Sequence, residues 1–278
     1  MRNLRKIYVM TDLEGVAGVL DHDNWCTPQS RYYEKAKGLL TREVNAAVDG
    51  FLRAGGEEIV VADGHGWGGL DPELLDERAR LLRGWPEGPY PLGLDETFDA
   101  CAWVGQHAKS GSLEAHLAHT QSFGFLDLSV NGLSIGEFGQ FALCASELGV
   151  RSIFGSGDLA FCREAEALVP GIVTVSVKRG LGKRAGQGLT REEYSKLNTA
   201  AIHLSPGKAR ESIARGALDS LSISRDRGSG IAELKPPLER VAVFRPTEDK
   251  PKMISRERHD TSFIGLMNTA YNPEPVEG

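Results

Sequence analysis

The 278-residue sequence has few cysteines, and the four lie apart at positions 26, 101, 144 and 162 without a Cys-x-x-Cys motif. This spacing argues against a zinc–thiolate site and indicates reduced thiols, as in a cytosolic protein. Long apolar runs are also missing, and the first, residues 7–10, is too short for the core of a secretory signal. We therefore expect a cytoplasmic protein with no membrane partner.

Excess positive charge is absent as well. Lys and Arg number 32 against 38 Asp and Glu, which leaves a formal net charge of −6. Together with the shortness of the basic pairs Lys178-Arg179 and Lys183-Arg184, which we interpret as solvated surface, this argues against a nucleic-acid partner. The length allows one large domain or two modest ones, with a substantial core.

What the sequence does contain is an alternation of short apolar runs and helical patterns. Strands are expected at residues 6–12, 58–63, 100–105, 151–155 and 171–177. Helices are expected at residues 32–53, 137–148 and 159–168. This alternation favours an α/β fold with a largely parallel sheet flanked by helices.

Other segments carry turn and capping signals. Asp71-Pro72 has the form of an N-cap and first-turn proline and predicts a helix at 71–82, and residues 110–119 predict a short helix. Residues 84–93, with three prolines among glycines, predict a loop at the rim of a site. Asn131-Gly132 predicts a hairpin turn between two short strands.

Acidic residues and histidines stand just past the ends of these apolar runs. Asp12 and Glu14 follow the first run, His65 the second and His107 the third, and a fourth run at 133–136 ends on Glu137. Because the carboxyl ends of parallel strands meet at one edge of a sheet, we expect these five side chains to converge. Oxygen and imidazole ligands together suit Zn, Mn, Co or Fe(II). The sequence therefore predicts a metallohydrolase.

Each residue also has an ordinary explanation. The carboxylates at 12 and 14 could lie in a solvated turn, a single histidine could cap or pack, and Glu137 in a first helical turn is stabilised by the helix dipole. Recurrence in four segments favours a site. His116 and His119 would share one helix face, so one could reach the metal centre as acid or base while the other lies on the surface. We interpret the remaining histidines, His22, His203 and His259, as ordinary residues.

A change of composition at residues 180–188, rich in glycine and basic residues, predicts a domain boundary. We assign residues 1–185 to a metal-binding catalytic α/β domain and residues 186–278 to a smaller α+β domain. The second part carries a capping box from Thr190 to Glu193 and an N-cap with a first-turn proline at Ser205-Pro206, each predicting a helix. A strand is expected at 240–245.

Five motifs together resemble the zinc D-aminopeptidase family over about residues 6–185: TDLEGVAG at 11–18, DGHG at 63–66, GQHA at 105–108, LAHT at 117–120 and GEFG at 136–139. The resemblance implies two zinc ions per chain, with Asp12 bridging them and Glu14, His65, His107 and Glu137 completing their coordination. It implies that His119 is the catalytic histidine. It also implies a homodecamer whose channel admits only short peptides.

These observations predict a dinuclear zinc aminopeptidase for short peptides with N-terminal D-amino acids of the D-alanine type. In this enzyme His119 would shuttle a proton to and from the reacting groups. The preference for D-residues enters only through the resemblance. Two alternatives remain open: another two-metal hydrolase, such as an amidase or phosphoesterase, and a non-catalytic peptide- or metal-binding protein. The lack of an Arg or Lys beside the motifs that could clamp a phosphate argues against a phosphoester substrate.

Overall fold

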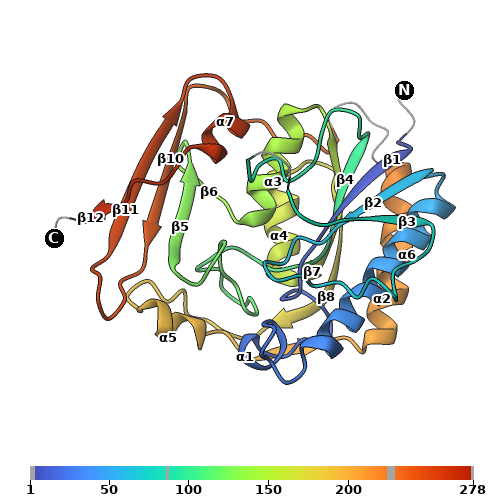
Figure 1. The fold of residues 1–278 in the computed structure, drawn as a ribbon, viewed down its shortest axis with the longest axis horizontal. Coiled ribbons are helices and arrows are strands. Elements are labelled where there is room, and N and C mark those ends of the chain that lie inside the picture. Colours follow the sequence, from blue (N-terminus) through green and yellow to red (C-terminus); the bar gives the residue numbers. More distant parts are fainter. Residues whose placement is uncertain (1–3, 86–87, 224–228, 277–278) are drawn as a thin grey trace.

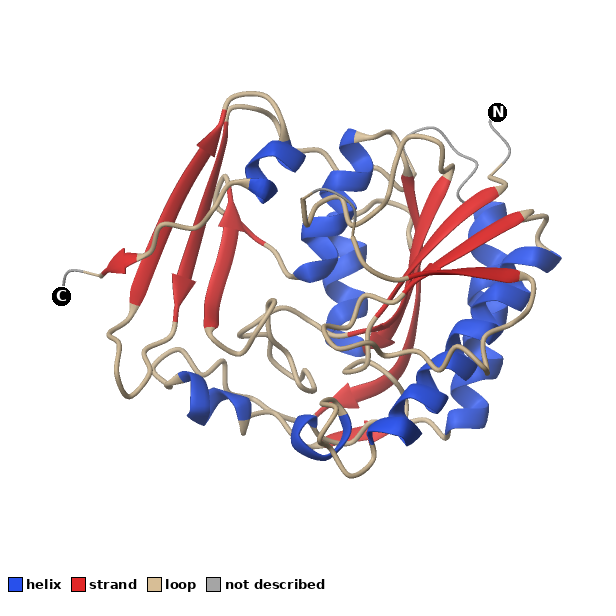
Figure 2. Ribbon diagram, in the orientation of Figure 1, coloured by secondary structure: helices blue, strands red, loops and turns tan. Residues whose placement is uncertain are grey.

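The computed structural model describes residues 4–85, 88–223 and 229–276 and contains two β-sheets (Figure 1; Figure 2). The larger sheet has, in spatial order, the strands β3 (Ala79–Leu82), β2 (Glu58–Ala62), β1 (Lys6–Thr11), β4 (Ala100–Gln106), β7 (Arg151–Asp158), β8 (Val173–Gly180) and β9 (Ala201–His203). All pairings are parallel except that of β8 with β9. The predicted largely parallel sheet is confirmed.

Helices cover both faces of this sheet (Figure 1). One face carries α2 (Tyr33–Arg53) and α6 (Pro206–Ile223), and the other carries α3 (Glu137–Glu147) and α4 (Leu159–Leu168). The side chains of β1 alternate between the two cores: Ile7 and Val9 lie in the core beneath α2, whereas Tyr8 and Met10 lie in the core beneath α3. The β1 pattern is apolar on both sides because both of its faces are buried.

The smaller sheet is antiparallel and has the order β12 (Glu274–Pro275), β11 (Met253–His259), β10 (Leu238–Phe244), β5 (Phe125–Val130) and β6 (Leu133–Ser134). The short helix α7 (Phe263–Asn268) lies between this sheet and α3. Asn131 and Gly132 form the predicted hairpin turn, with φ of 51° and 79°. The remaining helices are α1 (His22–Trp25) and α5 (Arg191–Ser195).

Both sheets draw on segments from either side of the predicted boundary at residue 185. β9 pairs with β8, and α6 packs on α2, so residues beyond 185 complete the larger sheet. Conversely β5, from the first part of the chain, pairs with β10 of the second part. The two parts of the chain therefore contribute to both sheets rather than to one sheet each.

Two predicted helices were wrong, and one predicted strand belongs to the other sheet. No helix forms at 71–82, where turns lead into the edge strand β3, paired with β2. No helix forms at 110–119, because Glu114 and Leu117 have φ of 52° and 56° and their amides donate to Gly182 and Asn198. The run before Glu137 belongs to the smaller antiparallel sheet as β6 rather than to the parallel one. No helix in the described part of the chain is long and apolar enough to cross a membrane.

Candidate metal centre

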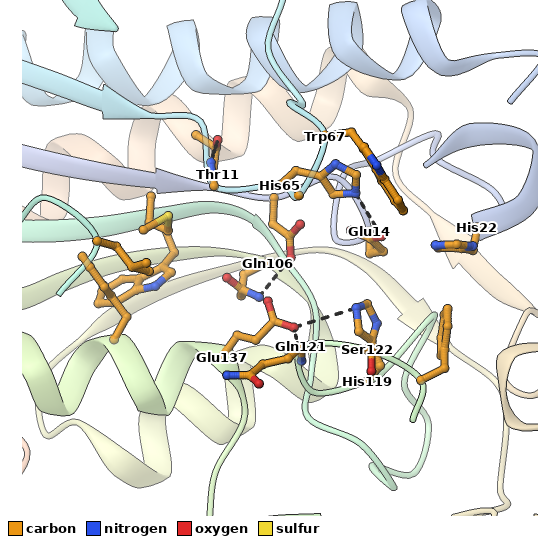
Figure 3. Close-up of a pocket in the computed structure, with 18 of the residues that line it drawn as sticks. Thr11, Glu14, His22, His65, Trp67, Gln106, His119, Gln121, Ser122 and Glu137 are labelled. Carbon is orange, nitrogen blue, oxygen red and sulfur yellow. Dashed lines mark hydrogen bonds and ion pairs between the residues drawn. The ribbon is translucent and has the colours of Figure 1, made fainter. Parts of the chain in front are cut away.

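The adjacency of β2, β1 and β4 in the sheet brings three of the predicted segments together. Asp12 and Glu14 follow β1, His65 follows β2, and His107 follows β4, all at the carboxyl edge of the parallel strands. Glu137 reaches the same place from the first turn of α3, opposite this edge (Figure 3). The five predicted ligands therefore converge beside a cavity of about 510 Å³.

The potential ligand atoms form two groups of three, each with all atoms within 4.8 Å of one another. The first group is Asp12, Glu14 and His65, in which His65 Nε2 lies 3.4 Å from Glu14 Oε1. The second is His107, His119 and Glu137. In this group the Nε2 atoms of the two histidines lie 3.6 and 3.8 Å from Glu137 Oε1.

Asp12 connects the two groups. Its Oδ2 atom lies 3.2 Å from His107 Nε2, although the aspartate belongs to the other group. The same oxygen accepts a hydrogen bond from the Gln106 amide, and Oδ1 accepts one from the backbone N–H of Leu13. A carboxylate in this position can place one oxygen toward each group, as a bridging ligand requires.

The histidine tautomers test whether these residues fit metal ions. His107 Nδ1 lies 2.9 Å from the carbonyl of Ala108, and His119 Nδ1 lies 2.9 Å from that of Leu117. A carbonyl only accepts, so in each neutral ring Nδ1 carries the proton and Nε2 presents a lone pair to the carboxylates.

Buried atoms without partners support the same conclusion. His107 Nε2 and Glu14 Oε2 are buried and have no hydrogen-bond partner among the described residues. Lone pairs facing carboxylate oxygens repel each other unless a cation or a proton lies between them. The donor set therefore fits divalent cations that accept imidazole and carboxylate ligands.

Charges inside the site shift its titrations strongly. Burial and then the charge of Glu14 raise the pKa of Asp12 to about 7, while burial of Glu14 is outweighed by His65, which holds the pKa of Glu14 well below its usual value. Burial alone would lower the pKa of His65, but Glu14 raises it to about 9. Burial and the nearby His107 lower the pKa of His119 to about 4. Divalent cations would take the place of these shared protons.

The loop after β1 is held by two buried ionisable residues that we did not predict to lie near the site. The Lys178 ammonium donates to the carbonyls of Glu14 and Val16, and Glu43 Oε1 accepts from the amide of Ala17 at 3.0 Å. Our interpretation of Lys178 as solvated surface was wrong, since only 2% of it is exposed. Its length lets the head group reach the loop from β8.

We expect Glu43→Gln to make thermal stability less sensitive to pH. Burial raises the pKa of Glu43 from 4.5 to about 8, so the folded state keeps a proton that the unfolded state releases. The stability that this group contributes therefore falls as pH rises from about 4.5 to 8. Glutamine does not titrate, and it keeps the side-chain oxygen that accepts the hydrogen bond from the Ala17 amide. The melting temperature of the variant minus that of wild type should therefore increase as the pH is raised from 5 to 8. Glu34→Gln, at an exposed position of α2, should show no such trend.

The cavity beside the ligands contains further residues that sequence analysis missed. Tyr90 and Leu92 line it, so the loop at 84–93 contributes to the rim as expected, with residues 86 and 87 outside the described part. His22, which we interpreted as ordinary, also lines it, as does Arg191. Arg191 weakens the sequence argument against a phosphate group in the substrate, which depended on the absence of such a cation.

The two histidines of the 110–119 segment separate in the structure. His119 lines the cavity and stacks on His107 with ring centroids 4.0 Å apart. His116 is fully buried instead of exposed, with Nε2 3.1 Å from the carbonyl of Leu20 and its ring against His203. The prediction that one of the pair reaches the centre is supported by geometry, and the prediction that the other lies on the surface was wrong.

Comparison with known proteins now decides the family. The sequence profile of the D-aminopeptidase family matches residues 5–245, most of the chain. The chain belongs to the D-aminopeptidase family. A D-aminopeptidase of Bacillus subtilis strain 168 is 30% identical over 197 residues, which cover 70% of this chain and 71% of that protein. The predicted family and the predicted class of enzyme, a peptidase, are thereby confirmed.

The fold of this D-aminopeptidase family member also has a solved counterpart. The Zn-dependent D-aminopeptidase DppA from Bacillus subtilis, described as a self-compartmentalizing protease, superposes with a TM-score of 0.78. The match covers 95% of this chain and 94% of the other, at 22% sequence identity. The two chains therefore share their overall fold, including the division into a mostly parallel and a smaller antiparallel sheet.

Proposed function

We propose that this protein is a dinuclear zinc aminopeptidase that removes N-terminal D-amino acids from short peptides. The observation that carries the proposal is the pair of three-residue groups connected through Asp12 at the cavity. Membership of the D-aminopeptidase family supports the peptidase chemistry. The names of the Bacillus subtilis relatives support zinc and the D-configuration.

The chain's own residues have distinct parts in this reaction. The residues that would hold the ions are Asp12, Glu14, Glu137, His65 and His107. The three negative charges of the carboxylates would offset most of the four positive charges of two such ions. When bound, two such ions supply Lewis acidity and a water molecule of lowered pKa. The free amine of the substrate would bind at one of the ions or at a nearby carboxylate, which would restrict cleavage to the first peptide bond.

His119 is suited to moving the proton. Its Nδ1–H is held by the Leu117 carbonyl, so Nε2 presents a lone pair beside Glu137. Burial and the nearby His107 keep the pKa of His119 low, at about 4, so the ring is neutral near pH 7. In this form Nε2 can accept a proton from water as a general base. The same nitrogen then donates that proton to the leaving amine as a general acid.

The decisive experiment combines metal analysis with three substrates. We expect two zinc ions per chain and hydrolysis of a D-alanyl peptide, with little of its L-alanyl counterpart and none of a phosphodiester. Dipicolinate should remove activity, and added zinc should restore it. Preference for the phosphodiester would favour the phosphoesterase alternative, and full zinc occupancy without hydrolysis of any small amide would favour a binding protein.

We further propose that the protein works as a homo-oligomer, a decamer by family resemblance. The Bacillus subtilis DppA is described as self-compartmentalizing, which supports an enclosed assembly. Light scattering on the zinc-loaded protein should give a mass near ten times the 30.1 kDa of one chain. A monomeric mass would contradict this assembly while leaving the proposed chemistry intact. The cytoplasmic location stays a prediction.

A further inference from the structure

The cavity has an apolar end next to the candidate metal centre. Met10 precedes Asp12 by two residues, and Phe141 follows Glu137 by four on α3, so each apolar side chain shares a side or a face with a predicted ligand. Trp103 of β4 lies opposite Met10 in the strand register. In Figure 3 a group of carbon-rich side chains lies on the side of Glu137 and Gln106 that is away from His22.

This end is closed by the core of the protein. Trp103, Phe141 and Met10 are 1%, 2% and 6% exposed, yet all three line the cavity. Trp103 and Phe141 meet edge to face at 5.7 Å. Leu92 and Tyr90 from the rim loop also line the cavity. The residues named here carry no formal charge, so the end favours an uncharged apolar group.

A hydrogen-bonded network fixes the polar edge of this end to the metal centre. The Tyr90 hydroxyl donates to Gln140 Oε1 at 2.9 Å, and the Gln121 side-chain amide donates to the same oxygen at 2.7 Å. The backbone N–H of Gln121 in turn donates to Glu137 Oε1 at 2.6 Å. The rim loop and a predicted ligand are thus connected through Gln140 and Gln121.

The opposite end of the cavity is open. It is lined by Trp67, 62% of which is exposed, by the exposed Arg191, and by the half-buried His22 and Phe123. In an aminopeptidase no residue precedes the one that is released, so the closed side accommodates that residue alone. The rest of the peptide, which varies in length, needs the open side.

We infer that the apolar end formed by Met10, Leu92, Trp103 and Phe141 receives the side chain of the N-terminal residue, and that it selects a bulky aliphatic or thioether side chain over the methyl group of alanine. The inference rests on the proposed aminopeptidase function and specifies its substrate class. Each additional buried methylene is worth about 10- to 200-fold in an apolar pocket. The flexible Met10 side chain adapts to leucine- and methionine-sized groups.

The test compares two substrates with the same leaving group on the zinc-loaded protein. We expect kcat/KM for D-leucine p-nitroanilide to exceed that for D-alanine p-nitroanilide by at least about tenfold. Met10→Ala should lower this ratio by about tenfold. Met267→Ala is the matched control, because Met267 is 5% exposed in the same core but does not line the cavity. A ratio of substrates measured on one sample is unaffected by partial unfolding.

A binding measurement separates this inference from the proposed function. Calorimetry should show that D-leucinamide binds the zinc-loaded protein more tightly than D-alaninamide, and that Met10→Ala, but not Met267→Ala, removes the difference. Tight, Met10-dependent binding without any hydrolysis would mean that the peptidase proposal fails while the apolar pocket stands. Equal binding and equal turnover of the two, or a preference for alanine, would overturn the pocket assignment and leave the peptidase proposal in place.

Discussion

Asp12→Ala is expected to empty both metal positions and abolish hydrolysis. Asp12 belongs to the group with Glu14 and His65, yet its Oδ2 lies 3.2 Å from His107 of the other group. If Asp12 is the bridging ligand that we propose, its loss would remove a ligand and a negative charge from both positions at once. Zinc content should fall from two ions per chain to near zero. Loss of a residue that only hydrogen-bonds to a metal ligand lowers activity by up to about 100-fold. The value of kcat/KM for Asp12→Ala should fall by more than this.

The control for this experiment is a buried aspartate outside the centre. Asp158 is fully buried and accepts hydrogen bonds from the amides of Phe161 and His116 at 2.7 and 2.8 Å, but it does not line the cavity. Asp158→Asn should keep two zinc ions even if it lowers the melting temperature. Retention of two zinc ions in Asp12→Ala would refute its bridging position. Loss of one ion only would assign it to a single metal.

The convergence of part of the candidate centre could be predicted because it depends on the parallel sheet, which is a regular element. Asp12, His65 and His107 each follow a strand, and the strands they follow are neighbours in the order β2-β1-β4. In a parallel sheet the carboxyl ends of all three strands lie at the same edge. A polar residue directly after an apolar run was therefore enough to predict that the three side chains lie close together. The two-sided burial of β1 also shows in the sequence as a continuous apolar run.

The rest of the centre depends on long-range geometry that local patterns do not encode. Glu137 arrives from the smaller sheet through β6, so its proximity to His107 is set by how the two sheets face each other. His119 lies in an irregular segment whose helical pattern is overridden by positive φ at Glu114 and Leu117. Only the family resemblance singled out His119, because spacing alone placed it equally with His116.

Two buried ionisable residues were also not predicted from the sequence. Lysine and glutamate are usually found at the protein surface, so a single sequence gives no reason to expect Lys178 and Glu43 to be buried. Both are buried because the backbone of the loop after Asp12 needs partners for its amide and carbonyl groups. Arg191, from the second part of the chain, was missed because nothing near it in sequence belongs to the site.

His119→Ala is expected to abolish turnover while leaving both metal ions bound. Removal of a general acid–base group costs about 10²- to 10⁴-fold in rate. The expectation depends on His119 carrying protons instead of binding metal, although its Nε2 lies within 4.8 Å of ligand atoms of His107 and Glu137. Metal stoichiometry separates the two roles, since a proton carrier can be removed without loss of an ion. The measurement is zinc content beside kcat on the same sample.

His116→Ala provides the matched control from the same segment. Its ring is fully buried and does not line the cavity, so its loss should lower stability but leave turnover per folded molecule near that of wild type. If His119→Ala binds only one zinc ion, His119 is a ligand and the proton must move through another group, with Glu137 the nearest carboxylate at 3.8 Å. Near-normal turnover in His119→Ala would remove the histidine from the mechanism altogether. Zinc content distinguishes the two roles of His119, because a ligand is needed to bind the ion before the reaction begins, whereas a proton carrier is needed only during the reaction.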